Sequence, residues 1–273
     1  MSALAKEVLK CVGAPASVAG VIDVAAWVGS YPFRGIPRSN VRDLLELGAT
    51  LSIARSVVSP YEAVFWENGL DAYARWAEEW SSEPQLNVWP VVRPGALNGL
   101  EALLDRHRPR GLRMVPSYHG YHLYDADIEP IMQIARERGM IVQIFTRLAD
   151  ERWHWMLKVP ELPLHDIDYA VAIYDQQPLI VSGLNQPQSL AARMKQHPML
   201  FADISRHRGP TSGIERLVQS APVDRLLFGS LWPVQIIEAT LCQVTAARID
   251  PATRNAILRD NARALLHLSE STS

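Results

Sequence analysis

The sequence alternates short apolar segments with amphipathic ones, and this alternation limits the folds that are open to the chain. Most of the apolar segments are uniformly apolar, which is typical of parallel strands that are buried on both faces. The amphipathic segments place apolar residues at i, i+3 and i+4, the spacing of a helix with one buried face. The sequence therefore predicts eight strands, at residues 21–24, 51–58, 86–92, 111–115, 140–145, 179–181, 199–204 and 225–228.

Helices are predicted in the gaps, at residues 41–47, 70–80, 100–107, 128–138, 167–174, 190–196 and 214–220, with a last helix at 251–268. Asn40 is a predicted N-cap, because Asp43 follows it three residues later as in a capping box. Ser212 begins a second pattern of the same kind. Gly139 follows a basic turn, as a C′ glycine does, and Asp250 precedes a proline that suits the first helical position.

The predicted strands begin about every 29 residues, which is close to the length of one βα unit in a barrel of roughly 250 residues. We therefore predict an α/β protein whose single domain spans residues 1–273. Its fold would be one (β/α)8 TIM barrel, at about residues 20–268, with an extra C-terminal helix. The alternative, a doubly wound open sheet, would place a glycine-rich phosphate turn after the first strand. That position reads DVAAWVG, and no phosphate-binding glycine motif occurs in the chain.

The charge balance excludes several kinds of partner. The 27 Lys and Arg residues against 29 Asp and Glu give a formal net charge of −2, which leaves no basic footprint for nucleic acid. No window approaches about 18 consecutive apolar residues, and the N-terminus lacks the apolar core of a signal peptide. Cys11 and Cys242 lie far apart and fit no disulfide or thiolate-metal motif. These features predict a soluble cytoplasmic protein with no nucleic-acid or membrane partner.

Polar and aromatic side chains gather near the predicted strand ends, where a (β/α)8 barrel builds its active site. The candidate site residues, in chain order, are Asp23, Trp27, Arg55, Arg93, Arg113, Tyr118, His119, His122, Arg147, Asp150, Arg152, His154, Asp203, Ser230 and Trp232.

Five of these candidates are predicted to be catalytic. Arg113 and Arg147 would clamp substrate oxygens, because a guanidinium offers a rigid fork to carboxylate, phosphate or enolate groups and stabilises developing negative charge. Asp23, His119 and Asp203 are candidate general acids and bases. The other ten are predicted to bind substrate. The competing interpretation is structural, since strand-end arginines in barrels often pair with neighbouring aspartates.

Five segments of the chain together resemble a known family. They are VIDVAAWVGSYPF, the stretch from GLRMVPSYHG to GMIVQI, LFADIS, DRLLFGSLWP and ILRDNARALLHL, and the last two are the most specific. In this order, from about Val21 to Leu268, they are similar to the amidohydrolase-related branch of the amidohydrolase superfamily. The resemblance implies a (β/α)8 barrel with hydrolase, lyase or isomerase activity, which depends on a metal in most members.

The departures from this family concern its metal ligands. The family's first strand normally ends in D-x-H-x-H, and here Asp23 is kept while Ala25 and Trp27 stand at the two histidine positions. The usual histidines of the fifth and sixth strands and the aspartate of the eighth are also replaced. Because a catalytic ion needs three or more protein ligands, we expect no metal and no other cofactor. His119 and His122 form a close pair that could rebuild a site only with two further ligands.

The predicted function is that of a metal-independent enzyme acting on a small organic molecule that is anionic or bears a carbonyl group. Hydrolysis of an ester, lactone or amide ranks first, and decarboxylation, isomerisation or cyclisation on the same scaffold are the alternatives. A second class is a non-catalytic barrel that acts as a binding or assembly module. The polar strand ends favour the enzyme, and the replaced metal ligands favour the module. A homodimer is one expected assembly.

Overall fold

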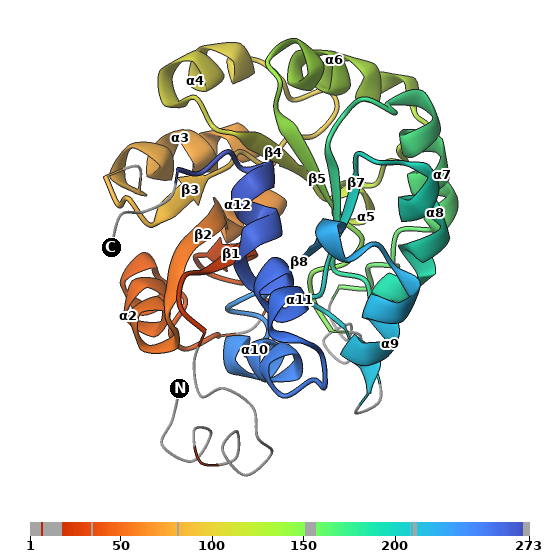
Figure 1. The fold of residues 1–273 in the computed structure, drawn as a ribbon. Coiled ribbons are helices and arrows are strands. Elements are labelled where there is room, and N and C mark those ends of the chain that lie inside the picture. The colour runs from red at the N-terminus through yellow and green to blue at the C-terminus, as the bar shows by residue number, and fades with distance from the viewer. Residues whose placement is uncertain are drawn as a thin grey trace.

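The computed structural model describes residues 18–33, 35–80, 82–150, 157–207 and 212–269, together with Glu7 and Gly209. Within these residues eight parallel strands alternate with helices that pack around the outside of the strands (Figure 1). Every one of the predicted apolar segments overlaps a strand. The strands are β1 (Val21–Val28), β2 (Ile53–Pro60), β3 (Leu86–Val88), β4 (Gly111–Met114), β5 (Ile141–Phe145), β6 (Leu179–Ser182), β7 (Leu200–Asp203) and β8 (Leu226–Leu227).

The strands form two parallel sheets in chain order, β1-β2-β3 and β4-β5-β6-β7-β8. Backbone hydrogen bonds cross both gaps between these sheets. The Val92 N–H donates to the Arg113 carbonyl at 2.9 Å, which joins the end of β3 to β4, and the Val24 N–H donates to the Phe228 carbonyl at 3.0 Å, which joins β1 to the end of β8. The strands therefore follow one another round in the order of a (β/α)8 barrel, as the alternation predicts.

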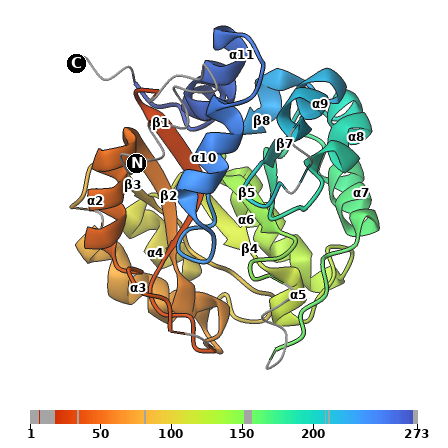
Figure 2. The same ribbon diagram turned by 90° about the horizontal axis from the view of Figure 1, so that it is seen from below.

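Helices fill the gaps between the strands (Figure 2). None in the described part of the chain is long and apolar enough to cross a membrane. The α-helices are α2 (Val41–Leu51), α3 (Gly69–Trp80), α4 (Leu100–His107), α5 (Pro116–His119), α6 (Glu129–Glu137), α7 (Leu164–Ile173), α8 (Ala191–Gln196), α9 (Gly213–Ser220), α10 (Ile237–Thr245), α11 (Pro251–Asn255) and α12 (Asn261–Leu265). Short 3-10 turns are η1 (Tyr61–Val64), η2 (Ala126–Ile128), η4 (Pro187–Leu190) and η5 (Val223–Arg225).

The last part of the chain differs from the sequence-based expectation. Helix α10 is not predicted, because two threonines, Thr240 and Thr245, share its buried stripe and interrupt the apolar periodicity. The single helix expected at 251–268 is divided by one π-helical stretch, η6 (Ala256–Asp260), between α11 and α12. The next residue, Asn261, donates from its amide to the carbonyls of Val223 and Leu226 at 2.7 and 2.8 Å. The π turn therefore places an amide that fastens the C-terminal helices to the start of β8.

Three of the predicted helix-end signals are confirmed. Asn40 Oδ1 accepts from the Asp43 N–H at 2.9 Å, and Asp43 accepts in return from the Asn40 N–H at 3.4 Å, which is a complete capping box. Asp250 caps α11 by accepting from the Thr253 N–H at 2.9 Å. Gly139 has φ of 60° after α6, a conformation that favours glycine.

The capping box predicted at Ser212 is wrong. Its side chain makes no cap hydrogen bond with α9. The Glu215 carboxylate, which would complete the box, instead accepts from the Arg248 N–H at 2.9 Å. The Arg248 N–H, which lies beyond α10 in the chain, therefore occupies the Glu215 carboxylate that a capping box requires.

Aromatic side chains pack inside the ring of strands. Trp27, Trp89 and Phe145 are fully buried there, together with the Arg113 side chain. Gly111 at the start of β4 fits against this filling, because a Cβ atom at that position would lie 2.6 Å from the Trp89 ring. Bulky rings in the interior therefore require the smallest residue on the neighbouring strand.

The difference between the two capping patterns gives a stability test. Asn40→Ala removes a side-chain acceptor from the first turn of α2, and we expect the free energy of unfolding to fall by about 1 kcal/mol. Ser212→Ala is the matched control, because no cap hydrogen bond is lost, and its effect should stay within about 0.5 kcal/mol. Urea denaturation measures both. Equal losses in the two variants would contradict the assignment of the caps.

Candidate active site

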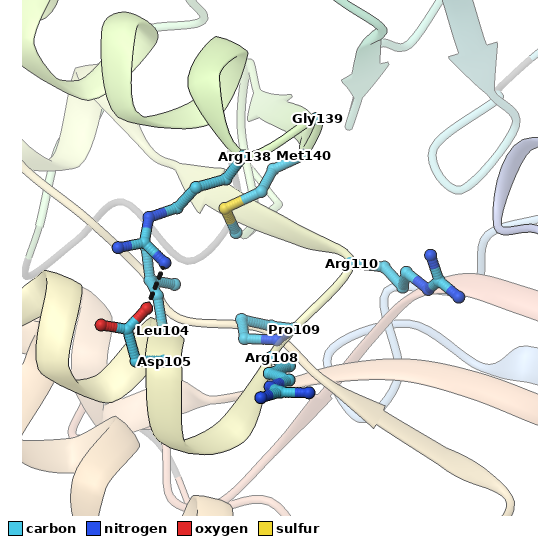
Figure 3. Close-up of a pocket in the computed structure, with 8 residues that line it drawn as sticks. All are labelled: Leu104, Asp105, Arg108, Pro109, Arg110, Arg138, Gly139 and Met140. Carbon is cyan, nitrogen blue, oxygen red and sulfur yellow. Dashed lines mark hydrogen bonds and ion pairs between the residues drawn. The ribbon is translucent and has the colours of Figure 1, made fainter.

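The site of a (β/α)8 barrel lies at the carboxyl ends of the strands. A surface cavity of about 630 Å³ lies instead beside the amino ends of β4 and β5 (Figure 3). It is lined by Arg108 and Arg110 before β4 and by Arg138 before β5, and Arg138 is already paired with Asp105 at 2.6 Å. The candidate residues at the strand ends therefore define the site better than this cavity does.

Asp23 joins β1 to the segment that follows β8. Its Oδ1 accepts from the Ala25 N–H at 3.0 Å and from the Ser230 N–H at 2.9 Å. Its Oδ2 accepts from the Ser230 hydroxyl at 2.5 Å, and the hydroxyl oxygen in turn accepts from the Trp232 N–H at 3.0 Å. Asp23 is fully buried and lies near the start of β1, and these bonds fix the GSLWP segment beside this strand.

Arg113 lies fully buried in the interior and connects three strands. Its guanidinium donates to the carbonyls of Ala26 at 2.7 Å, Val24 at 2.9 Å and Val57 at 2.9 Å, and to the Gln143 side chain at 2.8 Å. Its planar group also lies 4.8 Å from the Trp27 ring and 5.2 Å from the Phe145 ring. The donors of Arg113 are therefore committed to the protein itself, so we assign it a positioning role rather than the predicted oxygen clamp.

A chain of polar side chains leads from Arg113 toward Asp203 at the end of β7. Gln143 donates to the Ser182 hydroxyl at 2.8 Å and to the Val24 carbonyl at 3.0 Å. Asp203 Oδ1 accepts from the Ser205 N–H at 2.9 Å and from the Ser205 hydroxyl at 2.6 Å. Asp203 Oδ2 is buried and forms no hydrogen bond of ordinary geometry with the described residues. The Ser182 hydroxyl and the Gly183 N–H nevertheless lie close enough to Asp203 to lower its pKa.

Burial sets the ionisation of these groups. It raises the pKa of Asp23 from 3.8 to about 6, although the Ser230 hydroxyl and the charge of Arg113 act in the opposite direction. Burial also raises the pKa of Asp203, against the lowering effect of the Ser182 and Ser205 hydroxyls. Desolvation lowers the pKa of Arg113 to about 9, which the two carboxylates resist, so the guanidinium stays charged at neutral pH. The interior thus holds one cation and two carboxyl groups that retain protons more readily than usual.

A second group of candidates lies above this network, where the segments after β4, β5 and β7 meet. The Tyr118 hydroxyl accepts from the Ala149 N–H at 3.0 Å, and Arg206 donates to the Ala149 carbonyl at 2.7 Å. Arg147, 7% exposed, lies within 4.0 Å of Glu161. Burial raises the pKa of Tyr118, and the charges of Arg206 and Arg147 offset part of the rise. We call Tyr118, Arg147 and Arg206, with the buried Tyr61, the mouth cluster.

The other predicted residues are placed in several ways. Asp150 is buried and follows Arg147 of the mouth cluster closely in the sequence. Trp232 is also buried and closely follows Ser230. Arg55 lies near the start of β2, away from the carboxyl end of that strand. Arg152 and His154 lie outside the described residues. The catalytic and substrate-binding roles of the candidates stay predictions.

His119 and His122 do not form the pair that the sequence left open. The His119 Nε2 lies 3.1 Å from the Val64 carbonyl, and burial together with the Arg93 charge lowers its pKa to about 4. A neutral imidazole at pH 7 suits positioning better than proton donation. His122 turns instead toward Asp166.

The comparisons with known proteins agree with this architecture. The family model described as amidohydrolase matches residues 23–268. The chain belongs to the amidohydrolase family. No curated protein matches the sequence.

Several solved structures share the fold. A 2,6-dihydroxybenzoate decarboxylase from Rhizobium has a TM-score of 0.74 at 14% identity, over 92% of this chain and 99% of that chain. A dihydroxybenzoic acid decarboxylase from Polaromonas sp. JS666, with bound manganese and the inhibitor 2-nitroresorcinol, has a TM-score of 0.71 at 15% identity, over 92% and 98%. A 5-carboxyvanillate decarboxylase from Sphingomonas paucimobilis has a TM-score of 0.69 at 9% identity, over 92% and 100%. At these identities the likeness shows the fold.

The residues at the centre of this amidohydrolase barrel do not fit the divalent ion that the family implies. Ala25 and Trp27 offer no ligand atom on β1, and the Trp27 ring lies against the Arg113 cation. The Asp23 oxygens accept hydrogen bonds from Ala25 and from the Ser230 segment, and the Asp203 carboxylate accepts at Oδ1 from Ser205. Within the described residues, the group of ligand-type side chains close enough to share an ion lies elsewhere and consists of His122, His165 and Asp166.

Several members of the network are missed by reasoning from the sequence. Gln143 and Ser182 carry no motif, although a glutamine in the middle of the apolar strand IVQIF is a signal that could have found the first. Ser205 and Arg206 are not missed, because they follow β7 at a strand end, where the fold directs attention to them. Their roles depend on partners from other strands, which spacing along the chain does not reveal.

The raised pKa of Asp23 predicts a pH dependence of stability. Because the folded protein holds this proton more tightly than the unfolded chain, the contribution is fully present below about pH 4 and is lost progressively as the pH rises from about 4 through 6. Asp23→Asn keeps an acceptor oxygen but cannot ionise. Between pH 4 and pH 7 we expect wild type to lose up to about 3 kcal/mol of unfolding free energy relative to this variant.

Urea denaturation at a series of pH values measures the difference between the two proteins. The control is Asp224→Asn, at a carboxylate that is 78% exposed, whose pH profile should run parallel to that of wild type. An Asp23→Asn profile that also runs parallel to wild type would show that Asp23 titrates as an ordinary carboxylate.

Proposed function

We propose that this member of the amidohydrolase family is an enzyme that decarboxylates a small aromatic acid, by acid and electrostatic catalysis with no ion at the centre of the barrel. The observation that carries the proposal is the Asp203 carboxyl group, which is buried at the end of β7, has a raised pKa and has an Oδ2 without a hydrogen bond of ordinary geometry to the described residues. Such a group is a proton donor held in a dry site.

The surroundings of Asp203 suit a proton transfer. Ser205 donates both its N–H and its hydroxyl to Oδ1, so the carboxyl group is held in one orientation. Gly229 lies against the other oxygen, since a Cβ there would be 2.9 Å from Asp203 Oδ2. Arg113 stabilises the carboxylate that remains after the proton has left, through the attraction between their charges.

The mouth cluster suits an anionic aromatic substrate. Arg147 and Arg206 supply positive charge beside the phenols of Tyr118 and Tyr61. Trp27 lies edge-on to the Tyr61 ring with the centroids 5.4 Å apart, which continues the aromatic wall into the barrel. Arginine binds a carboxylate or phenolate oxygen in a bidentate manner, and the rings offer apolar contact to a planar substrate.

The reaction needs only a proton from the enzyme. The bond between the ring carbon and the carboxylate carbon breaks, and its electron pair stays on the ring carbon. That carbon takes the proton of Asp203, and carbon dioxide leaves. The raised pKa of the aspartate favours the protonated form that the step consumes.

Two observations bear on the choice of reaction. The three neighbours named above are decarboxylases of aromatic acids, which supports the proposal without deciding it. Hydrolysis, which ranks first from the sequence, is the second candidate, because an ionised Asp203 could activate a water molecule. The raised pKa favours proton donation over this role.

Asp203→Asn tests the proposal. The amide keeps the shape of the side chain and removes the acidic proton, so we expect kcat for decarboxylation of hydroxybenzoates to fall at least about 100-fold. Carbon dioxide release measures the rate, and the reaction in D2O should place deuterium on the ring carbon that lost the carboxylate. Asp224→Asn, at an exposed position, should retain the wild-type rate.

The activity should also survive treatment with a chelator, because no step uses an ion at the barrel centre. Wild-type turnover by Asp203→Asn would contradict the role of this aspartate. Turnover of esters or lactones, with no carbon dioxide released from any aromatic acid, would assign hydrolysis instead.

A further inference from the structure

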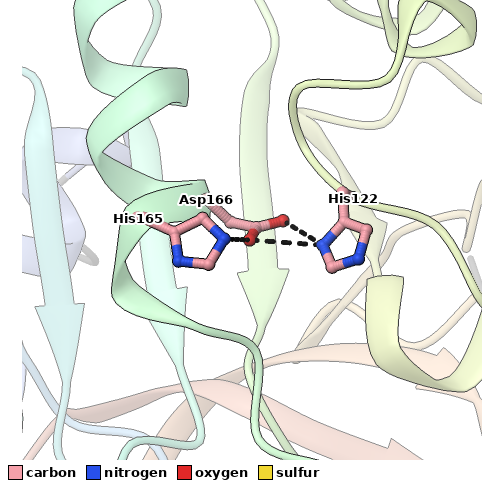
Figure 4. A group of neighbouring side chains, drawn as sticks. All are labelled: His122, His165 and Asp166. Carbon is pink, nitrogen blue, oxygen red and sulfur yellow. Dashed lines mark hydrogen bonds and ion pairs between the residues drawn. The ribbon is translucent and has the colours of Figure 1, made fainter.

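Two histidines and an aspartate meet outside the barrel interior (Figure 4). His122 follows α5 in the connection from β4 to α6, and His165 and Asp166 belong to the first turn of α7. Their ligand atoms all lie within 4.8 Å of one another. We call these three residues the histidine–aspartate cluster. It brings together segments that are far apart in the sequence and that flank neighbouring strands.

The two oxygens of Asp166 have different partners. Oδ1 faces both imidazoles, at 3.4 Å from His122 Nδ1 and 3.2 Å from His165 Nε2. Oδ2 accepts from the Leu123 N–H at 2.8 Å and also lies 3.2 Å from His122 Nδ1. The carboxylate is fully buried, so the backbone donor fixes its orientation while Oδ1 stays directed at the two rings.

These separations lie at or beyond the long end of ordinary N–H···O hydrogen bonds, and they also fit ligands that share one ion. Charge-assisted hydrogen bonds are about 2.7–2.9 Å long. Ligand atoms around a tetrahedral ion, at bonds of about 2.0–2.1 Å, are instead separated by about 3.3–3.4 Å. The contacts of Asp166 Oδ1, at 3.2 and 3.4 Å, match the second value. Two nitrogens on the same tetrahedral ion also lie about 3.3–3.4 Å apart. The ligand atoms here lie within 4.8 Å of one another, so closing the site takes a movement of the rings of up to about 1.4 Å.

One aromatic ring holds both histidines in place. Tyr124 stacks on His122 with the centroids 4.8 Å apart and the planes 7° apart, and on His165 with the centroids 6.0 Å apart. The His122 N–H donates to Asp125 at 2.7 Å, which fixes the turn that carries the imidazole. The ligands are therefore positioned before any ion binds, which lowers the ordering cost of binding.

We propose that the histidine–aspartate cluster binds a divalent transition-metal ion of the zinc class, with water completing the coordination. Two imidazoles and one carboxylate are the ligand set of such ions, whereas calcium and magnesium prefer oxygen ligands alone. The side chains of His122 and His165 are 47% and 64% exposed, so an ion reaches the site from solvent. The bound ion ties the β4–α6 connection to α7, and it is independent of the chemistry proposed for Asp203.

Titration of the chelator-treated protein with Zn2+ tests this inference. Calorimetry should detect one equivalent bound, and Co2+ in its place should give the visible absorption of a low-symmetry nitrogen and oxygen site. His122→Asn and His165→Asn each remove one ligand, and we expect the Zn2+ affinity to fall at least about 10-fold in each. Thermal unfolding should shift upward with Zn2+ in wild type and much less in these variants.

His267→Asn is the matched control, because it removes an exposed histidine outside the cluster from a position with φ of 49°, which asparagine tolerates. Its Zn2+ affinity should equal that of wild type. Circular dichroism of the metal-free variants separates loss of a ligand from loss of folding, and both ligand residues are exposed enough to be replaced without disturbing the core. Absence of binding to wild type, or equal affinity in the double variant His122→Asn/His165→Asn, would overturn the proposal.

Discussion

The guanidinium of Arg113 is the interaction on which the interior of this barrel depends. It donates to carbonyls of β1 and β2 and to the Gln143 side chain on β5, so a single group connects strands from both sheets. A buried charge of this kind is tolerated only when its donors are satisfied, and removing one partner costs several kcal/mol. The packing of Trp27 and Phe145 against the cation supplies the rest of its environment.

This cation also determines what the neighbouring acids can do. Asp23 and Asp203 lie close enough for their charges to resist the lowering of the pKa of Arg113, yet burial leaves both carboxyl groups with raised pKa values. Both oxygens of Asp23 accept hydrogen bonds from Ser230, which joins β1 to the segment that follows β8. Asp203 has one oxygen without a hydrogen bond of ordinary geometry to the described residues. The same electrostatic arrangement therefore supports a structural role for one acid and the proposed chemical role for the other.

The strands and most helices could be predicted from the sequence because buried parallel strands and amphipathic helices have distinct local patterns. The capping box at Asn40 is local and was predictable, whereas at Ser212 a distant backbone N–H takes the glutamate that the pattern needs. Asp203 was also predictable as a candidate, because the end of an apolar strand can be recognised from the local sequence. What Arg113 binds, and that His122 would meet Asp166, depend on how far-separated segments pack, which no spacing along the chain encodes.

We propose that the Arg113 guanidinium, and not a metal ion, fills the centre of this amidohydrolase barrel. Anomalous diffraction from crystals grown with Mn2+ and with Zn2+ tests it most directly, because it locates ions independently of activity. We expect no anomalous peak within bonding distance of Asp23 or Asp203, with the Arg113 guanidinium in density at the centre, and a Zn2+ peak between His122 and His165. A peak at the barrel centre that is coordinated by either of these aspartates would contradict it.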